Sequence, residues 1–243
     1  MECRAPLEFG AVLPAWPLLR RAPPGDGHTV LVFPGLAAND TTTAPLRHYL
    51  GSLGYQARGW SQGFNFGPRN GVLEAARKGI EDAFATSGRK LSLVGWSLGG
   101  VYARELAKEL PQLVRCVVTL GSPFSSHPKS TNAWRLYELA SGRDIEREHG
   151  SYDLPAAPPV PTTSIYSRSD GIVAWQGSVQ QAAADNPHTE NIEVRSSHIG
   201  IGVNPSAWWA VADRLAQPEG LWRRFEPGLA GFKGLLYPDP ERP

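Results

Sequence analysis

The sequence predicts an α/β fold in which helices cover both faces of a mostly parallel sheet of about six strands. Short apolar runs alternate along the chain with segments whose apolar residues recur at helical spacing, which is typical of repeated β-α units. The runs are continuous rather than alternating, as expected of strands that are buried on both faces. At 243 residues the chain is long enough for one well-filled domain, and we expect a single domain over residues 1–243.

The first half of the chain carries the clearest alternation. The apolar run at residues 29–33 ends at Pro34-Gly35, and the helical pattern that follows it closes at Gly54. The same order predicts strands at 29–33, 55–60, 91–94 and 114–120, of which the second is weak, and helices at 46–53, 73–84 and 98–110. Right-handed crossovers between these strands place helices on both faces of the sheet.

The alternation breaks in the second half. Residues 122–161 carry no strand signal and include one amphipathic helix, at 133–140. Because this insertion leaves the carboxyl end of a strand, where binding sites gather, we expect a small cap or lid there, with a surface excursion as the alternative. Strands are then expected at 162–166 and 192–194 and a helix over 204–215, with an irregular or briefly helical N-terminal arm at 1–27 and an extended C-terminal tail at 217–243.

Composition excludes several classes of function. The chain has 24 basic and 23 acidic residues and a net charge of +1, so neither nucleic acid nor an anionic membrane is suggested as a partner. No apolar run is long enough to span a membrane. Two cysteines, Cys3 and Cys116, with no secretory leader, favour a reducing, cytoplasmic location without disulfides. No metal-ligand spacing, phosphate loop or dinucleotide fingerprint occurs, so we expect no metal and no cofactor; the sequence does not indicate an oligomeric state.

One motif suggests chemistry. Gly95-Trp96-Ser97-Leu98-Gly99 lies between a predicted strand and a predicted helix. A serine on so sharp a turn is strained, and side chains two residues away on either side would clash, which glycine avoids. Such a turn exposes the serine hydroxyl beside a helix N-terminus, where negative charge is favoured. A Gly-rich turn before an ordinary helix is the alternative.

A serine hydroxyl needs a base, usually a histidine oriented by a carboxylate. His198 follows the strand at 192–194, and Asp170 follows the strand at 162–166, so both leave the same edge of the sheet as Ser97. The other histidines are placed less well, because they precede a strand or fall in a helix, the insertion or a polar loop. Asp40, Asp144, Asp153 and Asp185 compete with Asp170, but none directly follows a plausible core strand.

These motifs together resemble the α/β-hydrolase family, and within it small bacterial lipases and carboxylesterases that lack the first antiparallel strands of the fold. The resemblance covers roughly residues 28–216 and rests on Gly95–Gly99, Ser169–Val173 and Ser197–Gly200 in the order serine, aspartate, histidine. It implies that Ser97 is the nucleophile, that His198 is the general base and then acid, and that Asp170 holds the imidazole tautomer.

The resemblance also implies an oxyanion hole of two backbone N–H groups. One is expected from Leu98, and the other from Leu36, with Ala37 as the alternative. Many relatives have His-Gly where this chain has Pro34-Gly35. The donor is a backbone amide, so that change need not harm the hole.

The pocket around Ser97 is the least legible part of the sequence. Phe64 and Phe66, in a loop after the weak second strand, and Trp175, after the acid turn, are candidates to line it. The alternative is that these rings pack in the core. The predicted function is hydrolysis of short to medium acyl esters, with a small-molecule ester as substrate. An acyltransferase using the same acyl-enzyme and a non-catalytic binding protein on the same fold remain open.

Overall fold

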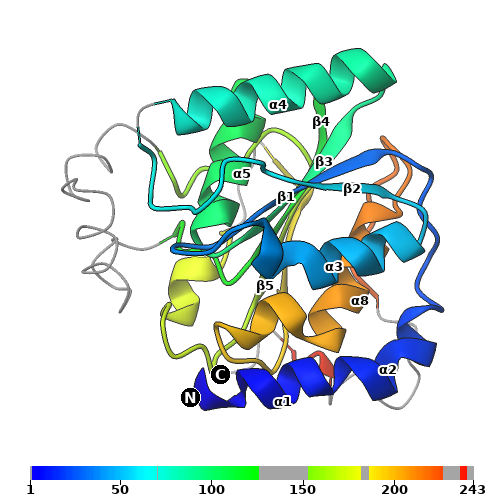
Figure 1. Cartoon of the computed structure of the whole chain (residues 1–243), viewed down its shortest axis with the longest axis vertical. Coiled ribbons are helices and arrows are strands. Elements are labelled where there is room, and N and C mark those ends of the chain that lie inside the picture. The colour runs from blue at the N-terminus through cyan, green and yellow to red at the C-terminus, as the bar shows by residue number, and fades with distance from the viewer. Residues whose placement is uncertain (1, 70, 126–152, 182–185, 227–235, 240–243) are drawn as a thin grey trace.

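A computed structural model describes residues 2–69, 71–125, 153–181, 186–226 and 236–239. Its centre is a six-stranded parallel sheet with the strand order β2-β1-β3-β4-β5-β6 (Figure 1). The prediction of a mostly parallel sheet of about this size is therefore confirmed. The strands are β1 (Thr29–Phe33), β2 (Gln56–Gly59), β3 (Leu91–Trp96), β4 (Val114–Leu120), β5 (Thr162–Tyr166) and β6 (Thr189–Glu193).

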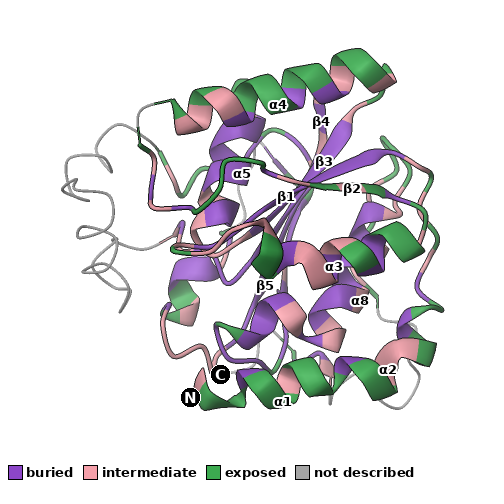
Figure 2. Ribbon diagram, viewed as in Figure 1, coloured by how far each residue is buried: buried purple, intermediate pink, exposed green. Residues whose placement is uncertain are grey.

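Burial explains which strands were easy to predict. Every residue of β1 and β5 is buried, whereas β2 lies at the edge of the sheet and alternates between exposed and half-buried positions. Figure 2 shows the central strands as the most buried part of the molecule. Side chains of one strand serve both faces: Val30 and Val32 join one core cluster, and Leu31 and Phe33 join the other.

The last strand differs from its prediction. It begins at Thr189 and ends at Glu193, whereas apolarity suggested 192–194. Its first half is polar, yet Glu190 is buried, because Arg214 and Thr163 donate to its carboxylate at 2.8 and 3.0 Å. A strand that contains a buried, paired carboxylate cannot be predicted from apolar runs alone.

Helices cover both faces of the sheet (Figure 1). On one face lie α4 (Val72–Ser87) and α5 (Leu98–Glu109), and on the other α3 (Asp40–Ser52) and α8 (Pro205–Leu215). The side chain of Asn204 accepts from the N–H groups of Ser206 and Ala207, so α8 begins at the predicted cap. Helix α3 begins six residues before the predicted 46, because Asn39 caps it.

The N-terminal arm is more helical than expected. It comprises the 3-10 turn η1 (Glu2–Arg4) and the helices α1 (Ala5–Gly10) and α2 (Val12–Leu19). Its buried residues Ala5, Val12 and Leu19 face the domain, where the arm contacts α8 and the 3-10 turn η4 (Gly200–Val203).

Two other predicted segments are only partly described. Most of the insertion at 122–161, including the helix expected at 133–140, lies outside the described residues. In the tail, the Tyr237 hydroxyl donates to the carbonyl of Ser206 at 2.9 Å. Among the described helices, none has the length and apolar character needed to cross a bilayer.

Candidate active site

Ser97 occupies the turn between β3 and α5, at the carboxyl edge of the sheet. Its backbone has a φ of 52° and a ψ of −122°, a conformation that non-glycine residues rarely adopt. A Cβ atom on Gly95 would lie 2.3 Å from the Cα of Gly100, and one on Gly99 would lie 2.4 Å from the carbonyl oxygen of Phe33. Glycine is therefore required at both positions. The sequence suggested that side chains at the two glycine positions would clash with each other. In the structure, a side chain at Gly99 would instead clash with the backbone at the end of β1.

The close packing of the turn predicts that a side chain at Gly95 will destabilise the fold. Replacing Gly95 by alanine should lower the free energy of unfolding by about 3 kcal/mol, because the new methyl group meets backbone atoms that no side-chain rotation can move. Gly79 is the matched control: it is exposed in α4, its added Cβ would meet nothing within 4 Å, and Gly79→Ala should raise stability by about 1 kcal/mol. Urea unfolding of both variants measures the difference. Equal stability of the two would show that the turn is not close-packed.

The three residues selected by sheet edge lie in one hydrogen-bonded chain. Nε2 of His198 is 2.9 Å from Oγ of Ser97, and Nδ1 of His198 is 2.6 Å from Oδ2 of Asp170. The other carboxylate oxygen of Asp170 accepts from the N–H groups of Ile172 and Val173 at 2.8 and 2.7 Å. Asp170 is thereby fixed in the loop after β5, and His198 in the loop after β6.

Two further residues surround this chain. Gly121 follows β4 with a φ of 57°, and a Cβ there would lie 3.2 Å from Oδ2 of Asp170 and 3.4 Å from Nδ1 of His198. Its small size lets the aspartate and histidine meet. The indole N–H of Trp96 donates to the carbonyl of His198 at 3.1 Å, while its ring packs against the core beneath the sheet. No role was predicted for Gly121, and its signal in the sequence is a glycine directly after a buried strand.

Two backbone N–H groups near Ser97 are not engaged within the described residues. The loop after β1 lies against the serine, since a Cβ on Gly35 would be 3.3 Å from that of Ser97. Ala37 donates its N–H to Asn65 at 2.7 Å, whereas neither Leu36 nor Leu98 donates to any described acceptor. Of the two N–H groups expected to complete an oxyanion hole with that of Leu98, the N–H of Leu36 is therefore favoured over that of Ala37. Buried Asn65 also donates to the carbonyl of Pro34 at 2.8 Å, and so holds this loop in place.

The aromatic residues predicted for the pocket lie in loops at the same edge. Phe64 is exposed and stacks on Phe66 with ring centroids 5.7 Å apart. Trp175 begins the 3-10 turn η3 (Trp175–Ser178) and stacks on Tyr166 at 5.9 Å. Whether these rings line the pocket stays a prediction.

The N-terminal arm reaches the loops that carry Asp170 and His198. The carboxylate of Glu2 accepts from the N–H groups of Gly171 and His198 at 3.1 Å and of Ile199 at 2.8 Å. Glu8 accepts from the N–H and hydroxyl of Ser197 at 2.9 and 2.8 Å. Neither glutamate was predicted to have a role, because their partners lie more than 160 residues away along the chain.

These contacts set the charge state of Glu2. Burial alone would raise its pKa, but the backbone N–H groups of Ile199, His198 and Gly171 outweigh burial and lower the pKa below its usual value. The contribution of Glu2 to holding the two loops is therefore present above its unfolded-state pKa, and is lost as the pH falls through its folded-state pKa.

A second serine–histidine–aspartate chain lies at the opposite edge of the sheet. Nε2 of His28 is 2.8 Å from Oγ of Ser92, and Nδ1 is 2.5 Å from Oδ1 of Asp26. Burial lowers the pKa of His28. Ser92 is wholly buried inside β3. This arrangement satisfies buried polar groups and offers no access to a substrate.

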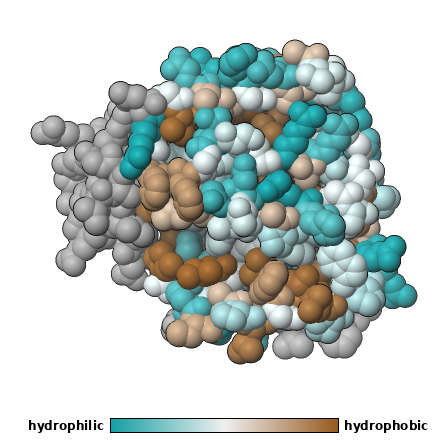
Figure 3. All heavy atoms as spheres, in the orientation of Figure 1, coloured by the Kyte–Doolittle hydropathy of each residue, from teal (hydrophilic) through white to brown (hydrophobic). Residues whose placement is uncertain are grey.

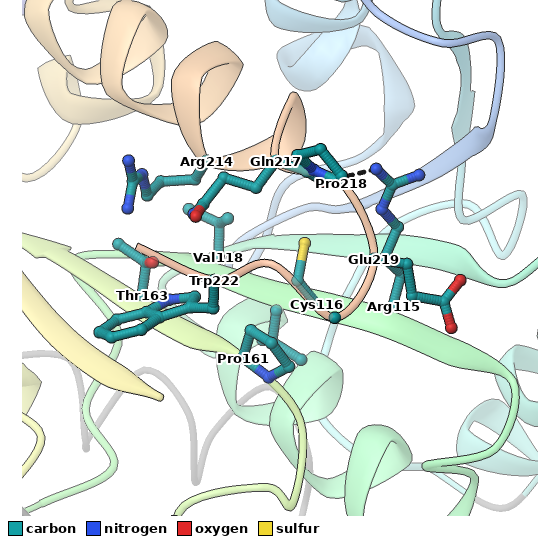
Figure 4. Close-up of a pocket in the computed structure, with 12 residues that line it drawn as sticks. Arg115, Cys116, Val118, Pro161, Thr163, Arg214, Gln217, Pro218, Glu219 and Trp222 are labelled. Carbon is teal, nitrogen blue, oxygen red and sulfur yellow. Dashed lines mark hydrogen bonds between the residues drawn. The ribbon is translucent and has the colours of Figure 1, made fainter. Parts of the chain in front are cut away.

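A cavity also lies away from Ser97, between β4, β5 and the segment after α8 (Figure 4). Arg115 and Arg214 border it, but their guanidinium groups are paired with Asp26 and Glu190. Within the described ranges, no three His, Cys, Asp or Glu side chains gather as a metal site would require.

Comparison with known proteins identifies the fold. No family model and no curated protein matches the sequence. Solved structures do match: lipase B of Aspergillus fumigatus (17% identity, TM-score 0.62), a monoacylglycerol lipase of Paleococcus ferrophilus (16%, 0.54) and a thioesterase domain from the curacin biosynthetic pathway (14%, 0.53). The matches cover 81, 80 and 79% of this chain and 54, 96 and 92% of those chains, so the chain spans about half the length of lipase B. The chain has the α/β-hydrolase fold.

Proposed function

We propose that this chain is a serine carboxylic-ester hydrolase. The observation that carries the proposal is the continuous chain from Oγ of Ser97 through His198 to Asp170, built on a strained turn at a helix N-terminus. The structural neighbours include two lipases and a thioesterase domain. That likeness supports hydrolysis in general, and the residues above supply the specific chemistry.

The proposed reaction has two halves. Oγ of Ser97 attacks the ester carbonyl carbon while Nε2 of His198 takes the serine proton, and the imidazolium then gives that proton to the departing alkoxide. Water, deprotonated by the same nitrogen, attacks the acyl-enzyme, and the proton returns to Ser97 as the acid leaves. Asp170 holds Nδ1–H of His198 and stabilises the imidazolium in both halves.

The negative charge of each tetrahedral intermediate falls on the former carbonyl oxygen. The N–H groups of Leu36 and Leu98 are the donors we assign to that oxygen, since both are free of other described acceptors. A single donor of this kind is typically worth about 3–4 kcal/mol of transition-state stabilisation. The positive end of the α5 dipole adds to the same effect.

A series of p-nitrophenyl esters of increasing acyl length tests the substrate class. We expect kcat/KM to be highest for short to medium acyl chains and to fall for long ones, with a competing alcohol leaving free acid as the main product. A dominant new ester in the presence of the alcohol would make the protein an acyltransferase instead. Absence of turnover on every ester would refute hydrolysis of this class.

A further inference from the structure

The N-terminal arm is apolar on its outer face as well as on the inner face that packs on the domain. Its two acidic side chains, Glu2 and Glu8, turn inward and bind backbone groups of the loops around His198. Val12 and Leu19 pack inward, but three other large apolar side chains turn outward: Leu7 is 78% exposed, Leu13 81% and Phe9 51%. A surface helix in water normally presents polar and charged residues on its outer face.

The outward face is continuous and almost free of charge. From Cys3 to Leu18 its exposed residues are uncharged except for Arg4, and the remainder are Cys3, Pro6, Leu7, Phe9, Gly10, Ala11, Leu13, Pro14, Pro17 and Leu18. Figure 3 shows brown, apolar groups among teal and pale ones at the lower edge of the molecule, where α1 lies. Single exposed leucines are ordinary, but a continuous apolar face on one element marks an interaction surface.

Arginines lie at both ends of this face. Arg4 lies at its start, where it also contacts Glu8, and Arg20 and Arg21 are exposed at its end with no ion pair in the described residues. The near-neutral composition of the whole chain conceals this local arrangement. An apolar face flanked by arginines is the pattern of helices that lie in the interface of an anionic lipid surface.

We propose that the outer face of α1 and α2 docks on an anionic lipid surface. The leucines and Phe9 would enter the boundary between headgroups and acyl chains, and Arg20 and Arg21 would contact lipid phosphates. A second copy of the chain is a poorer partner, because the exposed residues of the face from Cys3 to Leu18 include no carboxylate. Pairing of two such faces would therefore offer Arg20 and Arg21 no acidic partner.

The position of the face relates docking to the site. The same arm holds the loop of His198 through its inner carboxylates, and Ile199, beside His198, is 47% exposed. The arm therefore connects the outer face to the loop that carries His198. The docking itself does not rest on the proposed ester hydrolysis, since binding is measured without turnover.

Vesicle sedimentation tests the proposal. The full chain is mixed with vesicles of phosphatidylcholine alone or of equimolar phosphatidylcholine and phosphatidylglycerol, and should bind the mixed vesicles. The double variant Leu7→Gln/Leu13→Gln should bind about tenfold or more weakly, because the exposed leucines provide the buried apolar area. Leu221→Gln is the matched control: Leu221 is 61% exposed outside the arm, and its replacement should leave binding unchanged.

The arginines give a second, separate readout. Arg20→Gln/Arg21→Gln should weaken binding to the mixed vesicles by about tenfold and leave binding to phosphatidylcholine vesicles unchanged. Absence of vesicle binding by the unchanged chain would overturn the proposal, as would binding that the leucine replacements do not alter. Light scattering that finds a dimer, converted to monomer by Leu7→Gln/Leu13→Gln without any vesicle binding, would assign the face to a second copy instead.

Discussion

Replacement of Ser97 by alanine is expected to abolish ester turnover and covalent labelling by an organophosphonate. The variant lacks the only atom that we assign to acyl transfer, so kcat should fall by about a million-fold, as in serine hydrolases that lose the nucleophile. His198 and Asp170 keep their own hydrogen bond, and the glycines of the turn are unchanged. The folded structure should therefore persist. Intact mass measurement after labelling reports the covalent step directly.

The chain provides an internal control for this experiment. Like Ser97, Ser92 is hydrogen-bonded to a histidine, at 2.8 Å, with an aspartate beyond it, but Ser92 also accepts from the Cys116 thiol and is wholly buried at the other edge of the sheet. Ser92→Ala should retain both turnover and the organophosphonate adduct. An adduct that survives in Ser97→Ala but disappears in Ser92→Ala would identify Ser92, rather than Ser97, as the nucleophile. Loss in both variants, with circular dichroism unchanged, would mean that neither serine acts alone.

These two serines show why spacing alone cannot identify an active site. Ser97 was selected because a strand, a turn and a helix meet there and because two partners follow strands that end at the same edge. Ser92 lies inside a continuous apolar run, and its partners became apparent only when β1 and β3 were paired. In a parallel sheet every strand points the same way, so a residue that directly follows a strand is predicted to lie at the carboxyl edge.

Local pattern also accounts for most of the fold and fails at identifiable places. The strands β1 and β5 were predictable as continuous apolar or β-branched runs. The polar start of β6 was not, because Glu190 is buried only by virtue of Arg214, which comes from a distant helix. The contacts of Glu2 and Glu8 could not be predicted for the same reason. A glutamate in a short helix is expected to be exposed to solvent, and only the folded chain brings these two side chains to the loop of His198.

The second large effect is expected at Asp170. Its Oδ1 accepts two backbone N–H groups, so in Asp170→Asn the amide oxygen should keep that position and the NH2 group should face Nδ1 of His198. Nδ1 must then accept a hydrogen bond, which moves the ring proton to Nε2. That nitrogen can no longer take the proton of Ser97, and kcat should fall by about 10⁴-fold.

Because the two backbone hydrogen bonds survive, this loss should occur without unfolding. Asp82→Asn is the matched control, since Asp82 is exposed in α4 and, among the described residues, its carboxylate pairs with Lys78 alone. The rate of this variant should equal that of the unchanged chain. A steady-state rate measured with Tm for both variants separates the tautomer effect from instability. A near-normal rate in Asp170→Asn would assign the acid elsewhere, with Asp185, which lies outside the described residues, as the next candidate. A rate that falls together with Tm would instead make Asp170 a support of the loop after β5, and the orientation of His198 would then depend on Glu2 and Trp96.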